Sequence, residues 1–186
     1  EAFTNAIEYF NTRQETLVEK GKNLENAINA LEREITDYVV LASQKQLSTE
    51  ESNHAHIILQ SLNDIERIGD HCENIIEQAT DATLYNVSFS GEARQEMDNI
   101  LEVTNNTLLL AYRALERQDK SVARQVLAHE EKIDELQATY RKAHIRRLNE
   151  GICNGSNGAV FLDMLVNLER IGDHCRNIAG YVLEEE

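Results

Sequence analysis

Apolar residues recur every three or four positions along most of this chain, which is the spacing that places them on one face of an α-helix. Alternation typical of strands is nearly absent, and the chain has no proline. Turn residues cluster only at 86–91 and 151–158. The pattern therefore predicts six helices, over residues 2–10, 15–46, 50–83, 92–117, 120–149 and 157–185.

Two of the predicted helices carry a start signal in the sequence. Ser48 and Glu51 form a capping box ahead of the third helix, because the serine can accept from a backbone N–H while the glutamate reaches back. Asp119 is placed to act as the N-cap of the fifth helix.

A ten-residue phrase occurs twice in the chain. ERIGDHCENI at 66–75 returns as ERIGDHCRNI at 169–178, 103 residues later and with a single substitution. Over the wider windows 62–75 and 165–178, ten of fourteen positions are identical. A repeat of this kind indicates two copies of one structural unit. We therefore expect an all-α fold of two antiparallel three-helix bundles, residues 1–86 and 87–186, the first with a truncated opening helix.

The composition of the chain limits the classes of partner that it can bind. The formal charge of −15 argues against a nucleic-acid surface, whereas cations or basic partners fit it. A hydrophobic content of 41% is sufficient for a core, but no apolar run reaches the length needed to span a bilayer. No signal peptide is visible, and because the chain opens at Glu1 without a methionine we expect a fragment of a longer protein.

The third helix has an apolar stripe that should face the bundle interior. Cys72, and Cys175 at the same position of the second copy, lie on such stripes, so we expect both thiols to be buried and reduced. Gly69 in the stripe would permit close approach of another helix. The stripe consists of Leu62, Ile65, Ile68, Gly69, Cys72, Ile75 and Ile76.

Each copy also presents a carboxylate pair four residues apart, Glu66 with Asp70 and Glu169 with Asp173. Such neighbours on a helix repel, and an arginine or a bound cation would offset the repulsion. A solvated or arginine-paired surface pair is the plain interpretation. A cation site is the functional one, and oxygen ligands of this kind suit magnesium, calcium or manganese, or a carboxylate-bridged iron cluster.

Other residues do not extend these pairs into an enzyme site. His71 and His174 lie about 120° around the helix from their neighbouring acidic pairs, so we expect a supporting or surface role. A di-iron enzyme of the ferritin type needs Glu-x-x-His motifs on facing helices, and the chain has only the unrepeated Glu51–His54. No phosphate loop, nucleophile elbow or Cys-x-x-Cys points to another enzyme class.

The phrase LERIGDH at 168–174, followed by Asn-Ile, resembles the signature of PhoU-type proteins. The stretches 35–52, 147–153 and 161–169 are similar to the version that follows the membrane segment of bacterial Na/phosphate cotransporter family proteins. This resemblance extends over nearly the whole chain. It implies two three-helix bundles side by side, a regulatory role in phosphate transport, and multinuclear metal clusters held by Glu/Asp-x-x-x-Asp motifs.

The resemblance implies two such motifs in each bundle. The motif on the second helix of the second bundle would be Glu130–Asp134, whereas its equivalent in the first bundle is Glu25–Asn29, which lacks the second carboxylate. We therefore expect metal at the second bundle before the first. The cation would be iron, zinc, manganese or magnesium. The expected ligands are Glu130, Asp134, Glu169, Asp173, Glu66 and Asp70.

These observations predict a non-enzymatic regulatory domain of a Na/phosphate cotransporter family protein, located at the cytoplasmic face of the membrane and acting on its attached transporter segment. The leading alternative is a free-standing cytosolic PhoU-type regulator that docks on a phosphate transporter. A carboxylate-bridged metalloenzyme is the third hypothesis. A homo-oligomer is compatible with each of them.

Overall fold

The computed structural model describes residues 1–44, 47–153 and 155–184, and these residues form helices and short connections with no strand. Lys45, Gln46 and Glu185, which the sequence pattern placed in helices, lie outside the described residues. The helices are α1 (Ala2–Thr12), α2 (Thr16–Ser43), α3 (Thr49–Leu84), α4 (Gly91–Arg117), α5 (Lys120–Asn149) and α6 (Gly155–Glu184).

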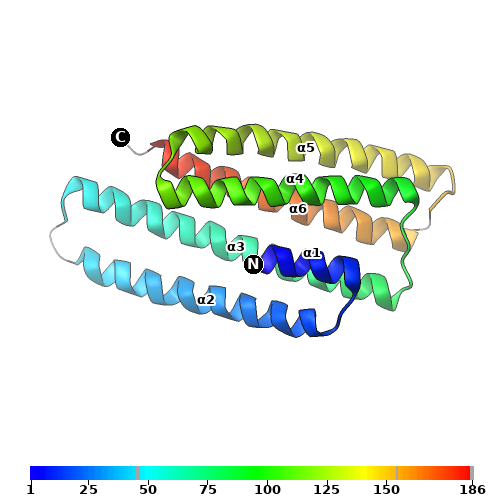
Figure 1. Ribbon diagram of the computed structural model, residues 1–186, viewed down its shortest axis with the longest axis horizontal. Coiled ribbons are helices and arrows are strands. Elements are labelled where there is room, and N and C mark those ends of the chain that lie inside the picture. Colours follow the sequence, from blue (N-terminus) through cyan, green and yellow to red (C-terminus); the bar gives the residue numbers. More distant parts are fainter. Residues whose placement is uncertain (45–46, 154, 185–186) are drawn as a thin grey trace.

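The helices form two three-helix bundles that lie side by side along one long axis (Figure 1). α1, α2 and α3 make the first bundle, and α4, α5 and α6 make the second. α3 and α6 pack along each other and join the two bundles, while α2 and α5 lie on opposite outer sides. The predicted tandem of antiparallel three-helix bundles is confirmed.

The start signals read from the sequence are present in the structure. The Ser48 hydroxyl accepts from the Glu51 N–H at 3.2 Å, and the Glu51 carboxylate accepts from the Ser48 N–H at 2.8 Å. Asp119 accepts from the backbone of Ser121 and Val122 at the start of α5. These bonds satisfy N–H groups that have no partner within the helix.

Several helix boundaries differ from the prediction by one to three residues, and the start of α6 is the difference that changes an expected loop. α6 begins at Gly155, so part of the segment expected to be a loop, 151–158, is already helical. The first helical turn tolerates glycine, serine and asparagine because its N–H groups lack intrahelical partners in any case. The other expected loop, 86–91, does connect α3 to α4.

One hydrophobic core runs through both bundles. Phe89, in the connection between α3 and α4, lies with its ring centroid 6.2 Å from that of Phe10 on α1 and 5.5 Å from that of Phe161 on α6. The aromatic side chains thus link the two halves at this end of the molecule. The division expected at residue 86 falls in this connection and stays a prediction, because the core does not separate there.

Ile65 departs from the predicted stripe. Its side chain is 38% exposed, whereas Leu168 at the equivalent position of the second copy is 0% exposed. α4 has 27 residues and packs along α6, but α1 has 11 and does not extend as far along α3. An open apolar groove therefore remains beside Ala2, lined by Ile28, Ile65 and Tyr112 among others.

Candidate functional site

The acidic residues of the second bundle meet where α5 and α6 approach closely. A Cβ atom at Gly172 would lie 3.1 Å from Ile133 Cδ1 and 3.7 Å from Glu130 Cγ, so only glycine allows this contact without a shift of the neighbours. One carboxylate oxygen from each of Glu130, Asp134 and Asp173 lies within 4.8 Å of the others. We call these three residues the second acidic cluster.

The charges of the second acidic cluster are offset by two arginines. Glu130 is 2% exposed, and Arg176 Nη1 donates to both of its carboxylate oxygens at 3.1 Å. Arg170 Nη1 donates to Asp173 Oδ2 at 3.1 Å. Burial raises the pKa of Glu130 and of Asp134, Arg176 lowers both, and the charge of Asp173 raises both. The carboxylates therefore repel one another beside the buried Glu130, and Arg176 relieves that repulsion.

Glu169 was predicted to share this site, but it stands apart from the three clustered residues. Its carboxylate pairs with Arg170 at 3.7 Å. Burial raises the pKa of Glu169, and the charge of Asp173 adds to that shift. The structure thus brings together three of the four acidic residues expected in the second bundle and leaves the fourth at its edge.

The equivalent residues of the first bundle are arranged less tightly. Arg67 lies 3.7 Å from both Glu66 and Asp70, and burial followed by repulsion from Asp70 raises the pKa of Glu66. The Asn29 amide donates to Glu25, and its own Oδ1 is buried without a hydrogen-bond partner. Among the described residues, no three acidic side chains here approach as closely as those of the second acidic cluster.

His71 and His174 lie neither at an acidic pair nor on the outer surface, so the expected surface role is wrong. Each reaches across to the other bundle. His71 Nδ1 lies 3.0 Å from Asn167 Oδ1 on α6, and the two histidine rings are 5.6 Å apart. Asn74 also donates to Asn167 Oδ1, at 3.4 Å. The histidines therefore belong to the contact between the bundles, which we call the seam.

The other half of the seam is centred on Asp64, which is 2% exposed. Its Oδ1 lies 2.7 Å from His174 Nδ1 and accepts from Asn177 at 3.0 Å, and its Oδ2 accepts from the Tyr181 hydroxyl at 2.8 Å. Burial raises the pKa of Asp64, but these three hydrogen bonds outweigh burial and lower it overall. Burial and the bond to Asp64 raise the pKa of Tyr181 to about 12.

Asp64 and Asn167 do not stand out in the sequence as candidate site residues. Each stands seven residues before a histidine of the repeated phrase, and each bonds the histidine of the opposite copy. Their one signal in the sequence is that both copies have a polar residue at the same buried position of the helix, which indicates a buried hydrogen-bond partner. The two copies therefore contact each other through equivalent positions, with a carboxylate in one half of the seam and an amide in the other.

Cys72 and Cys175 are buried and unpaired, as the apolar stripe predicted. Burial raises the pKa of the Cys72 thiol to about 12 and raises that of Cys175 as well. Neither thiol is therefore poised to act as a nucleophile or a metal ligand. Cys153 is partly exposed, with its sulfur 4.0 Å from His144 Nε2.

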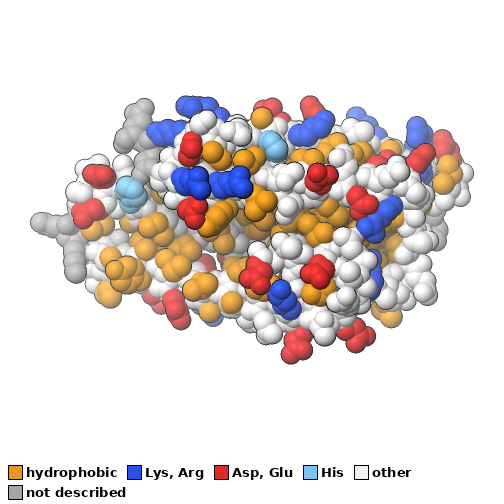
Figure 2. Space-filling model, in the orientation of Figure 1, with side chains coloured by type: hydrophobic (Ala, Val, Ile, Leu, Met, Phe, Trp, Pro, Cys, Tyr) orange, Lys and Arg blue, Asp and Glu red, His pale blue; other side chains and the backbone are white. Residues whose placement is uncertain are grey.

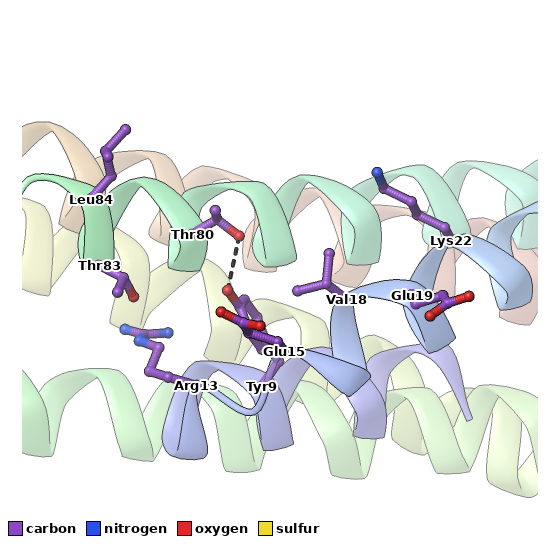
Figure 3. Close-up of a pocket in the computed structure, with 9 residues that line it drawn as sticks. All are labelled: Tyr9, Arg13, Glu15, Val18, Glu19, Lys22, Thr80, Thr83 and Leu84. Atoms are coloured by element: carbon purple, nitrogen blue, oxygen red, sulfur yellow. Dashed lines mark hydrogen bonds between the residues drawn. The ribbon is translucent and has the colours of Figure 1, made fainter.

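A surface pocket lies at the turn between α1 and α2, next to the end of α3 (Figure 3). Arg13 points toward Thr83, and the Tyr9 hydroxyl shares a 3.0 Å hydrogen bond with Thr80. Lys22 and two glutamates also line the pocket, so it carries charges of both signs. This mixture favours no particular class of ligand.

The fold and the site define a class: an all-helical protein made of two similar three-helix bundles, with acidic residues of two facing helices meeting in the second bundle. The sequence matches the family described as "PhoU domain" over residues 1–79 and 97–182. Because this match covers most of the chain, the chain belongs to the PhoU family.

Known relatives agree with this assignment. The chain is 28% identical to "Phosphate-specific transport system accessory protein PhoU homolog 1" of Thermotoga maritima, over 98% of this chain and 78% of the relative. It is 27% identical to "Putative inorganic phosphate export protein YjbB" of Escherichia coli K12, over 97% of this chain but only 33% of that much longer protein. The crystal structure of PhoU from Pseudomonas aeruginosa superposes on this chain with a TM-score of 0.89 and is 24% identical in sequence. The superposition covers 97% of this chain and 86% of that one, so the two proteins share their fold.

Proposed function

We propose that this protein regulates phosphate transport by binding the cytoplasmic side of a membrane phosphate transporter, without catalytic activity of its own. The observation that carries this proposal is the family match over both bundles, together with relatives whose names refer to phosphate transport. A regulator of this kind acts by binding one state of the transporter more tightly than another.

The relatives bear on whether the regulator is free or attached. The match to an accessory protein, of which this chain spans 78%, supports a separate regulator that docks on its transporter. The match to one third of the longer export protein supports the second candidate, a regulatory domain joined to a transporter segment. We favour the docking regulator, and the length of the native protein purified from its host distinguishes the two.

Electrostatics support a cytoplasmic docking surface. The cytoplasmic loops of membrane proteins are enriched in lysine and arginine, and the formal charge of this chain is −15. None of the described helices combines the length and the hydropathy needed to cross a bilayer. Attraction between an acidic protein and basic loops speeds their encounter and orients the partners.

The surface has an apolar patch at the end of the α2–α3 hairpin (Figure 2). Tyr38 and Ile58 line one hollow there together with Glu50 and Glu51. Leu41 is also exposed on this part of α2. Exposed apolar side chains rimmed by acidic ones are typical of a protein contact site, and they suit a basic, amphipathic transporter loop. We propose this patch as the transporter contact.

Phosphate uptake in host cells tests the proposal. We would compare cells lacking the protein with cells carrying the wild type, Tyr38→Asp/Leu41→Asp, or Leu84→Asp as a control on an equally exposed leucine at the far end of α3. We expect loss of the protein to change how uptake depends on external phosphate, and the double variant to behave like the loss. Leu84→Asp should behave like the wild type. Identical uptake in all four strains, at matched protein levels, would contradict the proposal.

A further inference from the structure

The single substitution in the repeated phrase falls at the second acidic cluster. Where the first copy has Glu73, the second has Arg176. The Arg176 side chain is 55% exposed, yet its guanidinium reaches Glu130, the most buried carboxylate of the cluster, and holds both of its oxygens at 3.1 Å. The charges of Glu131 and Asp134 also raise the pKa of Arg176, after the contribution of Glu130 itself.

The donor chemistry of the cluster suits a hard divalent cation, because Glu130, Asp134 and Asp173 offer three close carboxylates. A metal would need lone pairs of Glu130, the innermost of these ligands. Both oxygens of that carboxylate already accept from Arg176. The cluster as it stands therefore does not fit a metal ion, since a positive group already holds both oxygens of its most buried carboxylate.

The first copy relieves the same repulsion differently. There Asn29 replaces the residue equivalent to Asp134 and donates to Glu25, which removes one negative charge. Glu73 adds a negative charge, and burial together with repulsion from Glu25, Glu77 and Asp70 raises its pKa. The two copies thus differ in sign at one position: the first has a carboxylate where the second has a guanidinium.

We propose that Arg176 is a built-in cation that takes the place of a divalent metal ion in the second acidic cluster. A guanidinium stays charged at all physiological pH values and is tethered to the same helix as Asp173, so it is always present at the site. The repulsion within the cluster is therefore partly relieved without metal, and the cluster binds divalent cations weakly while Arg176 is in place. This inference concerns the chain itself and does not depend on the proposed transport function.

Calorimetric titration of the chelator-treated protein with MnCl₂ tests this inference. Arg176→Gln frees both oxygens of Glu130, and we expect it to bind Mn²⁺ at least about tenfold more tightly than the wild type, the factor corresponding to one lost charge-assisted hydrogen bond. Adding Asp173→Asn to that variant should abolish the gain. At the same concentration, Mn²⁺ should also raise the melting temperature of Arg176→Gln by more than that of the wild type.

Arg141→Gln is the matched control, because it removes the same charge from an exposed position of α5 but leaves the contact between Arg176 and Glu130 intact. It should change Mn²⁺ affinity by less than about threefold. Equal affinity in the wild type and Arg176→Gln, or an equal gain in both variants, would overturn the inference. If Arg176→Gln does not fold, Arg176→Lys replaces it. Lysine keeps the charge but not the planar contact, so its affinity should be intermediate, and unchanged affinity would again overturn the inference.

Discussion

Asp64 offers the sharpest test of how the two bundles are held together. This buried carboxylate on α3 accepts from His174, Asn177 and Tyr181 on α6 at 2.7–3.0 Å. Asp64→Ala removes the acceptor of all three bonds and leaves three polar groups in the seam without a partner. Because α3 and α6 make the main contact between the bundles, we expect the variant to lose stability as a whole protein.

The magnitude follows from the geometry. A hydrogen bond to a charged group contributes about 1.5–3 kcal/mol, but the three bonds share one carboxylate and are not additive. Breaking a buried charged network by removing one partner costs about 3–5 kcal/mol, and the lower end applies because the neighbouring histidine is partly exposed. We therefore expect Asp64→Ala to lower the free energy of unfolding by about 3 kcal/mol. This corresponds to a fall of about 6–12 °C in melting temperature for a chain of this size.

The pH dependence gives an independent check. The pKa of Asp64 is lowered in the folded protein, so its ionised form stabilises the fold above the ordinary aspartate pKa of about 3.9. That contribution is lost as the pH falls through the lowered value. The difference in unfolding free energy between wild type and Asp64→Ala should be full at pH 7 and should shrink below about pH 4.

Urea unfolding followed by circular dichroism measures this difference from pH 7 to pH 3. Asp81→Ala, an exposed aspartate on the same helix, is the control and should stay within about 0.5 kcal/mol of the wild type. If Asp64→Ala is as stable as Asp81→Ala at pH 7, then the hydrogen bonds across the seam do not hold the bundles together as argued.

Two further predictions concern buried groups elsewhere in the chain. In the native protein Cys153 should react with a thiol reagent much faster than Cys72 and Cys175. The reason is that only Cys153 is partly exposed and that burial raises the pKa of the other two thiols. Rapid labelling of all three would mean that the apolar stripe is open to solvent. Glu96→Ala should lower the free energy of unfolding by about 3 kcal/mol, because it leaves the buried guanidinium of Arg147 without its bidentate partner; an unchanged urea midpoint would refute this.

Helical periodicity and the internal repeat were sufficient to predict the architecture. Six helices, two copies and the buried positions of Cys72 and Cys175 all follow from spacing along single helices. Ile65 shows where this reasoning stops. Spacing tells which residues share a face, but burial also depends on what covers that face, and α1 is too short to cover Ile65.

The candidate site could be predicted only in part by the same reasoning. Pairs within one helix, such as Glu169 with Asp173, can be read from the sequence, and so can their equivalence between copies. Which carboxylates from α5 and α6 meet depends on the close packing at Gly172, and the role of Arg176 depends on the direction of a long, half-exposed side chain. Neither of these two contacts can be predicted from the spacing of residues along a helix. The partners of the histidines were missed because they lie on the other bundle.

Phosphate flux in inside-out membrane vesicles tests the central claim most directly, because these vesicles expose the cytoplasmic side of the transporter. The vesicles would come from host cells that lack this protein, and the purified chain would be added at increasing concentration. Regulation by docking predicts a saturable change in flux with the wild type and none with Tyr38→Asp/Leu41→Asp. Flux that stays constant at every concentration of wild-type protein would contradict the account.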